Sequence, residues 1–222
     1  MDDKFINLEN VSFSYKKGKM VFKDFSLSLD RNSISVILGE NGSGKTTLTK
    51  LIMGILSPQK GEIFIEGKPN QGVSLGEMGK SIGYLFQNPD HQIFGSSVME
   101  QLTWSSSLVS NDNENYHEKA KYLLKEFGIE NIKDTYPFYL SMGEKRILAI
   151  ASVMMRDVKY LIFDEPTSSL DSNREEVLVN MLLNLKQRGI GALVITHDYD
   201  FSKRIGQRII HLEDGRIEDE LI

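Results

Sequence analysis

The chain has 222 residues, 40% of them hydrophobic, which is enough for one large domain or for a core with a small subdomain. Its net charge of -5 argues against a nucleic-acid partner, and the lack of cysteine excludes disulfides and thiolate metal sites. The acidic start "MDDKFINLEN" is unlike a signal peptide, and no apolar run has the length to span a bilayer. A membrane complex is open to this chain only through a partner.

The first elements alternate in polarity. Residues 5–15 and 21–30 place apolar side chains at every second position, which predicts half-buried, antiparallel strands. A further short strand is expected at 61–67, between two glycines. Four later runs are nearly continuous in apolar residues, as in parallel strands covered on both faces: 33–38, 81–86, 160–163 and 192–196. Helical patterns follow several of them, the clearest at 177–185, and the order predicts an α/β fold with an antiparallel β part at its N-terminus.

The strand signal is absent between about 89 and 156. Helices are expected there at 96–109, 116–127 and 141–155, with a polar loop at 110–115. We interpret 89–156 as an inserted helical subdomain, and 1–88 with 157–222 as the core that carries the antiparallel β subdomain. The last of these helices opens on "LSMGE", where Ser141 is the expected N-cap and Glu144 closes a capping box.

A glycine-rich loop, "GENGSGKTT", follows the apolar run 33–38 and precedes a helical pattern. Such a loop turns backbone N–H groups toward phosphates, while Lys45 neutralises the β- and γ-phosphates and the Thr46 hydroxyl reaches Mg²⁺. A chance match is the alternative, but the required strand–loop–helix context is met. The expected nucleotide-binding residues are Gly39, Glu40, Asn41, Gly42, Ser43, Gly44, Lys45, Thr46 and Thr47.

Two acidic residues end the apolar run of "YLIFDEP". Parallel α/β sheets bind ligands at the carboxyl ends of their strands. Beside a phosphate-binding loop, Asp164 is therefore the expected Mg²⁺ ligand and Glu165 the group that orients or deprotonates the attacking water. Taken alone, the two acids would only mark the end of a strand.

These motifs, with "LSMGE", "SSLD" and "ITHD", stand in the order of an ATP-binding cassette (ABC) ATPase, and the resemblance covers essentially the whole chain. It implies a P-loop NTPase core of RecA-like fold, ATP and Mg²⁺ as cofactors, and a second cassette as partner. Tyr15 matches the aromatic residue that stacks on adenine. Gln87 matches the glutamine that touches Mg²⁺ or the water, and His197 the histidine that contacts the γ-phosphate.

The same resemblance makes Asp171 a residue that faces across the dimer, and Ser141 and Gly143 the groups that bind the γ-phosphate of ATP held by the opposite subunit. Two positions depart from the family's "LSGGQ": Met142 replaces a glycine and Glu144 a glutamine. Met142 is tolerated if its φ is negative, and we predict helical dihedrals there. For Glu144 we predict a carboxylate folded back onto the helix N-terminus rather than facing phosphate.

The segment "QNPDHQIF" is similar to the energy-coupling factor (ECF) class of vitamin and metal-ion importers. That resemblance implies a peripheral subunit at the cytoplasmic face of the membrane, bound to an integral transporter subunit. Candidates for the contact are Asp90, His91, Gln92 and Phe94, although a polar loop before a helix would look the same. Members of this class often have an extra C-terminal segment, and since the given sequence stops soon after "HLEDGRIEDELI", we expect that a C-terminal regulatory domain is absent or was removed.

Other functions agree less well with the motifs. Another class of ABC transporter and a non-transport ABC ATPase stay open as alternatives, although the chain lacks both a long coiled coil and a second cassette. A GTPase would need an Asn-Lys-x-Asp motif, of which "NIKD" at 131–134 is only a scrambled form. An inactive structural cassette is disfavoured because Lys45, Asp164, Glu165 and His197 are all present.

Overall fold

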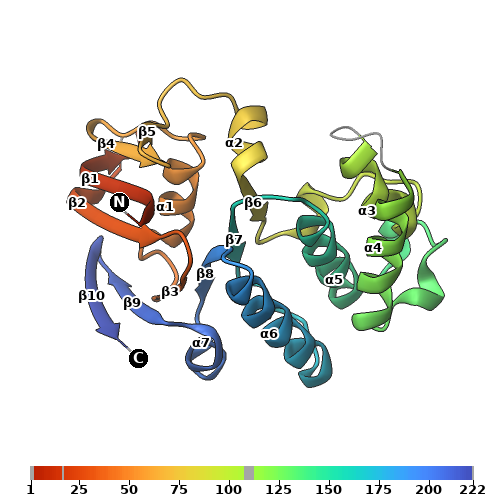
Figure 1. The fold of residues 1–222 in the computed structure, drawn as a ribbon. Helices are drawn as coiled ribbons and strands as arrows, with labels where there is room; N and C mark the ends of the chain where they lie inside the picture. Colours follow the sequence, from red (N-terminus) through yellow and green to blue (C-terminus); the bar gives the residue numbers. More distant parts are fainter. Residues whose placement is uncertain (1–2, 17, 108–112, 222) are drawn as a thin grey trace.

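The computed structural model describes residues 3–16, 18–107 and 113–221, and it contains two β-sheets with helices around them (Figure 1). The first sheet is antiparallel and has the order β2-β1-β4-β5. Its strands are β1 (Lys4–Ser14), β2 (Met20–Asp30), β4 (Lys60–Ile65) and β5 (Lys68–Pro69). The antiparallel pairing expected from the period of two is thus confirmed.

The second sheet has the order β10-β9-β3-β8-β7-β6. Its strands are β3 (Ile34–Leu38), β6 (Ile82–Leu85), β7 (Tyr160–Asp164), β8 (Gly191–Thr196), β9 (Arg208–Glu213) and β10 (Arg216–Leu221). All neighbours pair in parallel except β10, which returns antiparallel along β9. The four apolar runs are parallel strands, as predicted.

Each face of this sheet packs into its own core, which explains the continuous apolar runs. Val36 and Phe163 point to the side covered by the helices α5, α6 and α7. Ile37 and Ile162 point to the opposite side, against α1 and the antiparallel sheet. Because side chains alternate along a strand, a strand covered on both sides needs an apolar residue at nearly every position.

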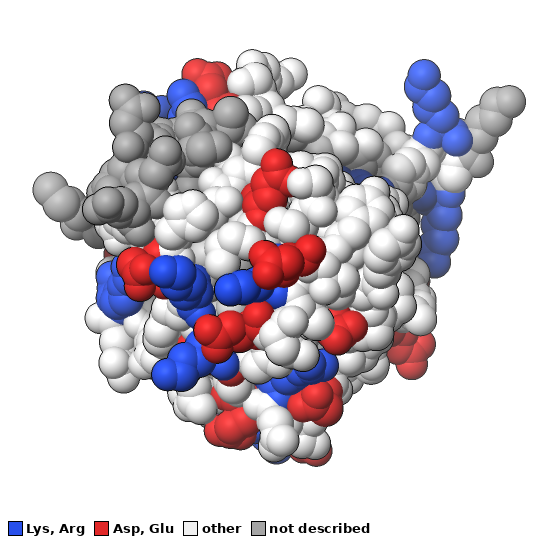
Figure 2. All heavy atoms as spheres, turned by 90° about the vertical axis from the view of Figure 1, so that its right-hand side faces the viewer, with Lys and Arg blue, Asp and Glu red and all other residues white. Residues whose placement is uncertain are grey.

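The α-helices are α1 (Lys45–Ile52), α2 (Leu75–Ser81), α3 (Val98–Ser107), α4 (Asn113–Glu126), α5 (Met142–Met154), α6 (Ser172–Gln187) and α7 (Tyr199–Ile205). Short 3₁₀ turns lie at Pro89–His91, Glu130–Ile132 and Pro137–Tyr139. Among the described residues, no strand lies between β6 and β7, and α3, α4 and α5 stand together at the right of Figure 1. The face they present mixes basic and acidic side chains beside a stretch of uncharged residues (Figure 2).

Two sequence expectations need correction. Residues 113–115 belong to α4 and not to the predicted loop. The rest of that loop, 110–112, and the end of the helix expected at 96–109 lie outside the described residues. Among the helices and strands of the described residues, five were not predicted: α2, α7, β5, β9 and β10.

Candidate active site and family

The glycine loop between β3 and α1 has a backbone that other residues could not adopt freely. Gly42 and Gly44 have φ values of 90° and 110°, in the region that favours glycine. At Gly39 a Cβ atom would stand 2.4 Å from the Leu212 carbonyl oxygen of β9. The loop therefore keeps its tight curve only with glycine at these places.

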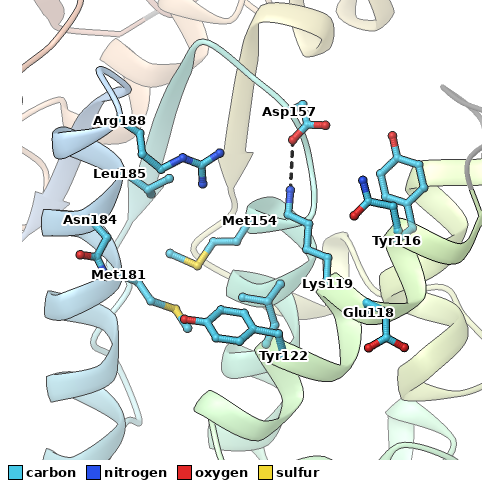
Figure 3. A pocket seen from close by; sticks show the side chains of 12 residues that line it. Tyr116, Glu118, Lys119, Tyr122, Met154, Asp157, Met181, Asn184, Leu185 and Arg188 are labelled. Carbon is cyan, nitrogen blue, oxygen red and sulfur yellow. Dashed lines mark hydrogen bonds and ion pairs between the residues drawn. The ribbon is translucent and has the colours of Figure 1, made fainter.

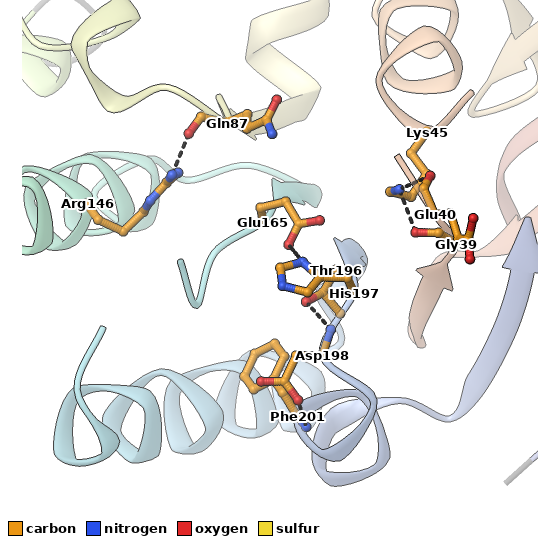
Figure 4. Close-up of polar contacts among 10 residues, drawn as sticks. All are labelled: Gly39, Glu40, Lys45, Gln87, Arg146, Glu165, Thr196, His197, Asp198 and Phe201. Atoms are coloured by element: carbon orange, nitrogen blue, oxygen red, sulfur yellow. Dashed lines mark hydrogen bonds and ion pairs between the residues drawn. The ribbon is translucent and has the colours of Figure 1, made fainter. Parts of the chain in front are cut away.

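Lys45, the first residue of α1, is buried beneath that loop. Its ammonium group donates hydrogen bonds to the carbonyl oxygens of Gly39 at 2.7 Å and Glu40 at 2.9 Å (Figure 4). Nearby, the Ser43 hydroxyl is buried and has no hydrogen-bond partner among the described residues. A buried hydroxyl without a partner costs free energy, so the loop is suited to a polar ligand.

A cavity of about 340 Å³ opens beside the loop. It is lined by Tyr15, Val21, Asn41, Gly42, Gly44, Lys45, Thr46, Thr47, Gln87, Asp164 and Glu165. The structure thus brings most of the expected nucleotide, metal and catalytic residues to one place. Tyr15 lies at its edge, with its hydroxyl 3.1 Å from Thr47 Oγ1 and 45% of the residue exposed.

Asp164, the last residue of β7, is only 2% exposed. Burial raises its pKa to about 6, and the neighbouring Glu165 adds to the rise, whereas Lys45 and Arg146 oppose it. Its Oδ2 atom is buried and has no hydrogen-bond partner in the described part of the chain. A buried oxygen with free lone pairs, next to the Thr46 hydroxyl in the same cavity, fits a hard divalent cation such as Mg²⁺.

Glu165 occupies an unusual backbone position, with a φ of 52° directly before Pro166. A left-handed conformation costs a residue with a side chain about 1–2 kcal/mol. Its Oε2 atom lies 2.9 Å from Nδ1 of His197, which follows β8. Because a carboxylate only accepts hydrogen bonds, the imidazole proton of this pair is on Nδ1. The pair joins the ends of two adjacent strands at the cavity (Figure 4).

The "LSMGE" stretch forms the N-terminus of α5. Ser141 is its N-cap, and its Oγ accepts from the Glu144 N–H at 3.3 Å. The Glu144 carboxylate accepts in return from Ser141 N at 2.9 Å and Ser141 Oγ at 2.7 Å. Met142 is the first helical residue and has no positive φ. The predicted capping box and the predicted dihedrals of Met142 are therefore confirmed.

These capping bonds have an electrostatic consequence. The hydrogen bonds from the Ser141 side chain and backbone lower the pKa of Glu144, and Arg174 contributes to the same direction. The carboxylate is thus stabilised in place on its own helix. Gly143 beside it approaches the Ser169 carbonyl oxygen so closely that a Cβ atom would stand 2.8 Å away.

Six expected nucleotide residues are not among those that line this cavity. Gly39, Glu40 and Ser43 of the loop line an adjoining hollow instead, and the other three are Ser141, Gly143 and Asp171. Asp171 instead caps α6, where its carboxylate accepts from Arg174 N at 3.0 Å and pairs with the Arg174 guanidinium. Arg174 lies near both Gly143 and Asp171. The predicted part of Ser141, Gly143 and Asp171 in nucleotide binding stays a prediction.

The structure also adds residues that sequence reasoning missed. Arg146 of α5 donates to the backbone carbonyls of Phe86 and Gln87. Gln92, a candidate for partner contact, instead turns inward, accepting from Phe86 N at 2.8 Å and donating to Ala149 O at 3.3 Å. No local pattern predicts these bonds, and the three that reach α5 or start from it join residues 57 to 60 positions apart in the sequence.

The remaining candidates for partner contact are more exposed. Phe94 is 56% exposed, with its ring edge-on to that of Trp104 at 4.6 Å. Asp90 forms an ion pair with Lys145 at 2.9 Å, and His91 lies near the Phe86 ring. In the part of the chain that the structure describes, no helix is long and apolar enough to cross a membrane.

Comparison with known families identifies the family of this chain. The family model described as "ABC transporter" matches residues 22–168, from β2 through the phosphate loop, α5 and the β7 carboxylates. The chain belongs to the ABC transporter family. It is an ATP-binding cassette and an ATPase, as the order of its motifs predicted.

Individual relatives extend over nearly the whole cassette. It is 37% identical to the energy-coupling factor transporter ATP-binding protein EcfA1 of Thermotoga maritima, over 96% of this chain and 80% of that one. It is 35% identical to the putative ABC transporter ATP-binding protein PF0068 of Pyrococcus furiosus, with 96% and 82% covered.

Solved structures agree in fold. The cbiO1 protein of Clostridium perfringens, described as part of the ABC transporter complex cbiONQ, has a TM-score of 0.84 and 31% identity, covering 98% of this chain and 88% of that one. The cassette MJ0796, solved as a dimer with ADP and phosphate, has a TM-score of 0.87 and 27% identity, with 97% and 98% covered. The expected RecA-like cassette fold with its β and helical parts is confirmed.

The cassette has a second, larger cavity of about 740 Å³ between α4, the end of α5 and α6 (Figure 3). Its floor includes Met154, Met181 and Leu185, and Lys119 spans its rim by pairing with Asp157 at 3.1 Å. It contains no phosphate loop and no paired carboxylates. The chemistry of the ATPase therefore belongs to the smaller cavity.

Proposed function

We propose that this cassette is the ATP-hydrolysing subunit of an ECF-type importer of a vitamin or metal ion. The observation that carries the proposal is the cavity that gathers Lys45, Thr46, Gln87, Asp164 and Glu165. The importer class is supported by the similarity of the chain to the Thermotoga energy-coupling factor protein and to cbiO1, and by the segment "QNPDHQ". The alternatives are another class of ABC transporter and a non-transport cassette.

Within the site, Lys45 binds the β- and γ-phosphates together with the N–H groups of residues 39–47, and Tyr15 supports the adenine. Thr46, Gln87 and Asp164 hold Mg²⁺, which when bound neutralises the phosphate charge that develops in the reaction. Glu165 orients the attacking water and takes its proton. His197, held by its 2.9 Å bond to Glu165, contacts the γ-phosphate with Nε2, which can donate to it only when both ring nitrogens are protonated.

A second cassette completes the site. Ser141 and Gly143 lie at the N-terminus of α5, a helix of 13 residues whose N–H groups and dipole favour an anion. We propose that two cassettes meet head to tail, so that this helix N-terminus contacts ATP bound at the partner's phosphate loop, with Asp171 facing across. Closure depends on the γ-phosphate because only that group adds contacts to the closed state. The dimeric MJ0796 structure supports this arrangement.

The helical segment 89–156 is proposed as a subdomain that receives an integral membrane subunit at the cytoplasmic face. Phe94 and Trp104 offer exposed aromatic surface there, and Asp90 offers a carboxylate. Residues 1–88 and 157–222 then form the core that binds nucleotide. The cassette is in this view a peripheral subunit, and its dimer partner is a second copy or a related cassette.

The central experiment measures Mg²⁺-dependent ATP turnover by the complex that co-purifies with the cassette. Glu165→Gln should lower turnover at least about 100-fold, because it removes the base, while ATP affinity stays within about threefold. Glu126→Gln, on the surface of α4, serves as the matched control and should keep full turnover. Turnover that survives Glu165→Gln would refute the assigned mechanism, and a partner other than a membrane protein would refute the transport role.

A further inference from the structure

Arg146 is a buried arginine one helical turn beyond the N-terminus of α5, and only 5% of it is exposed. Its Nη1 donates to the Phe86 carbonyl oxygen at 3.0 Å, and its Nη2 donates to the carbonyl oxygen of Gln87. Figure 4 shows the side chain reaching from α5 to the Gln87 backbone. A planar guanidinium donates to two neighbouring carbonyls from two separate nitrogens in a fixed geometry, whereas a lysine has only one nitrogen to offer.

Other contacts fasten the same segment to α5. Lys145 pairs with Asp90 at 2.9 Å, and the Gln92 amide accepts from Phe86 N while donating to the α5 carbonyl of Ala149. Residues 86–92 are therefore bonded to the first two turns of α5 at several points. Since β6 ends just before them at Leu85, a shift of α5 must bend the chain close to Gln87.

The charge of Arg146 is also unusual for a residue that only fills space. Burial lowers the pKa of its guanidinium, and the carboxylates of Asp164 and Glu165 oppose this shift. Its Nε is buried with no hydrogen-bond partner among the described residues. A buried charge is expensive, and a well-packed apolar side chain is often at least as stable in its place. The position is thus better explained by the ATPase site than by folding.

We propose that Arg146 is a positioning residue that makes Gln87 follow the N-terminus of α5. This inference rests on the proposed head-to-tail dimer. When Ser141 and Gly143 bind the partner's ATP, α5 is fixed, and Arg146 fixes the backbone of Gln87 in its own subunit. Gln87 then holds the water and metal geometry that Glu165 needs. Each nucleotide site is thereby made ready for hydrolysis only when the other one is occupied.

Arg146→Lys tests this because it keeps the charge but replaces the two guanidinium nitrogens, each of which donates to its own carbonyl, with a single ammonium nitrogen on a shorter side chain. In the assembled transporter we expect kcat to fall about tenfold while KM for ATP changes less than twofold. The second readout is amide hydrogen exchange in the full-length subunit carrying Glu165→Gln. There, ATP should increase protection of residues 86–92, and adding Arg146→Lys should abolish that increase without preventing dimer formation.

The matched control is Arg156→Lys, two residues beyond the C-terminal end of α5, where the arginine donates to the Gly79 carbonyl and neither residue lines the cavity. It should leave kcat and the exchange of 86–92 unchanged. Should Arg146→Lys fail to fold, Arg146→Gln is measured in the same way. A kcat within twofold of the parent, or unchanged ATP-dependent protection, would overturn the inference. A parent complex without ATP turnover would instead refute the proposed function.

Discussion

At the scale of single residues, Glu144 replaces the glutamine of the family's "LSGGQ" signature, and the structure shows how its charge is accommodated. Its carboxylate accepts two hydrogen bonds from Ser141 and so is turned back onto its own helix. We expect Glu144→Gln to keep ATP turnover within about threefold of the parent, because an amide oxygen can accept the same bonds. The measurement is steady-state turnover of the assembled complex. A large gain would mean that the carboxylate had been opposing closure on the γ-phosphate.

The same residue makes a pH-dependent contribution to stability. Hydrogen bonds from Ser141 lower the pKa of Glu144 below its ordinary value of 4.5. The stabilisation is therefore present above that ordinary value and is lost as pH falls through the lowered, folded-state pKa. Urea unfolding of the parent and of Glu144→Gln, from about pH 7 to about pH 3, should show a stability difference that shrinks at acidic pH. A difference constant over this range would contradict the capping assignment.

At the scale of elements, the sequence predicts the parts whose signal is local. Continuous apolar runs identify β3, β6, β7 and β8, because a strand covered on both faces must be apolar throughout. The strand β10 escapes this rule, since "RIEDEL" is polar and its place depends on pairing with β9. The turn between them did carry a usable signal: Asp214 and Gly215 both have positive φ, as a two-residue hairpin turn requires.

The segment before α3 depends on one buried side chain. Gln101, 2% exposed, accepts from the N–H groups of Phe94 and Gly95 at 2.9 Å and donates to the Gln92 carbonyl at 3.0 Å. Gln101→Ala leaves these groups unpaired, so we expect a loss of about 1–3 kcal/mol in the free energy of unfolding. Chemical denaturation measures this loss. We expect weaker retention of the membrane subunit as well, with ATP affinity unchanged.

Thr103→Ala provides the control for that prediction. Among the described residues, its hydroxyl donates to carbonyls within α3, those of Met99 at 3.0 Å and of Glu100 at 3.4 Å. It should change stability by less than about 0.5 kcal/mol. If Gln101→Ala were as stable as this control, the proposed role of the amide in shaping the docking segment would be wrong.

At the scale of the whole molecule, many cavity residues can be predicted from the sequence because they follow parallel strands that end at the same edge of one sheet. Glu165 directly follows β7, and His197 directly follows the neighbouring strand β8, so their contact follows from topology. Arg146 lies outside this logic, since its bonds depend on how α5 packs against the segment after β6. Such contacts depend on tertiary packing and produce no periodic pattern in the sequence.

The whole-molecule prediction concerns assembly. Neither Ser141 nor Gly143 lines the cavity, so in the proposed dimer a nucleotide contacts both the N-terminus of α5 and the cavity only between two chains. With Glu165→Gln and ATP, hydrolysis is blocked and the γ-phosphate persists, so light scattering after gel filtration should show a dimer. With ADP, or with Lys45→Ala and ATP, the same measurement should show a monomer, because the bridging charge or its binding group is missing. A dimer of equal stability in all three samples would place the interface elsewhere, independent of the γ-phosphate.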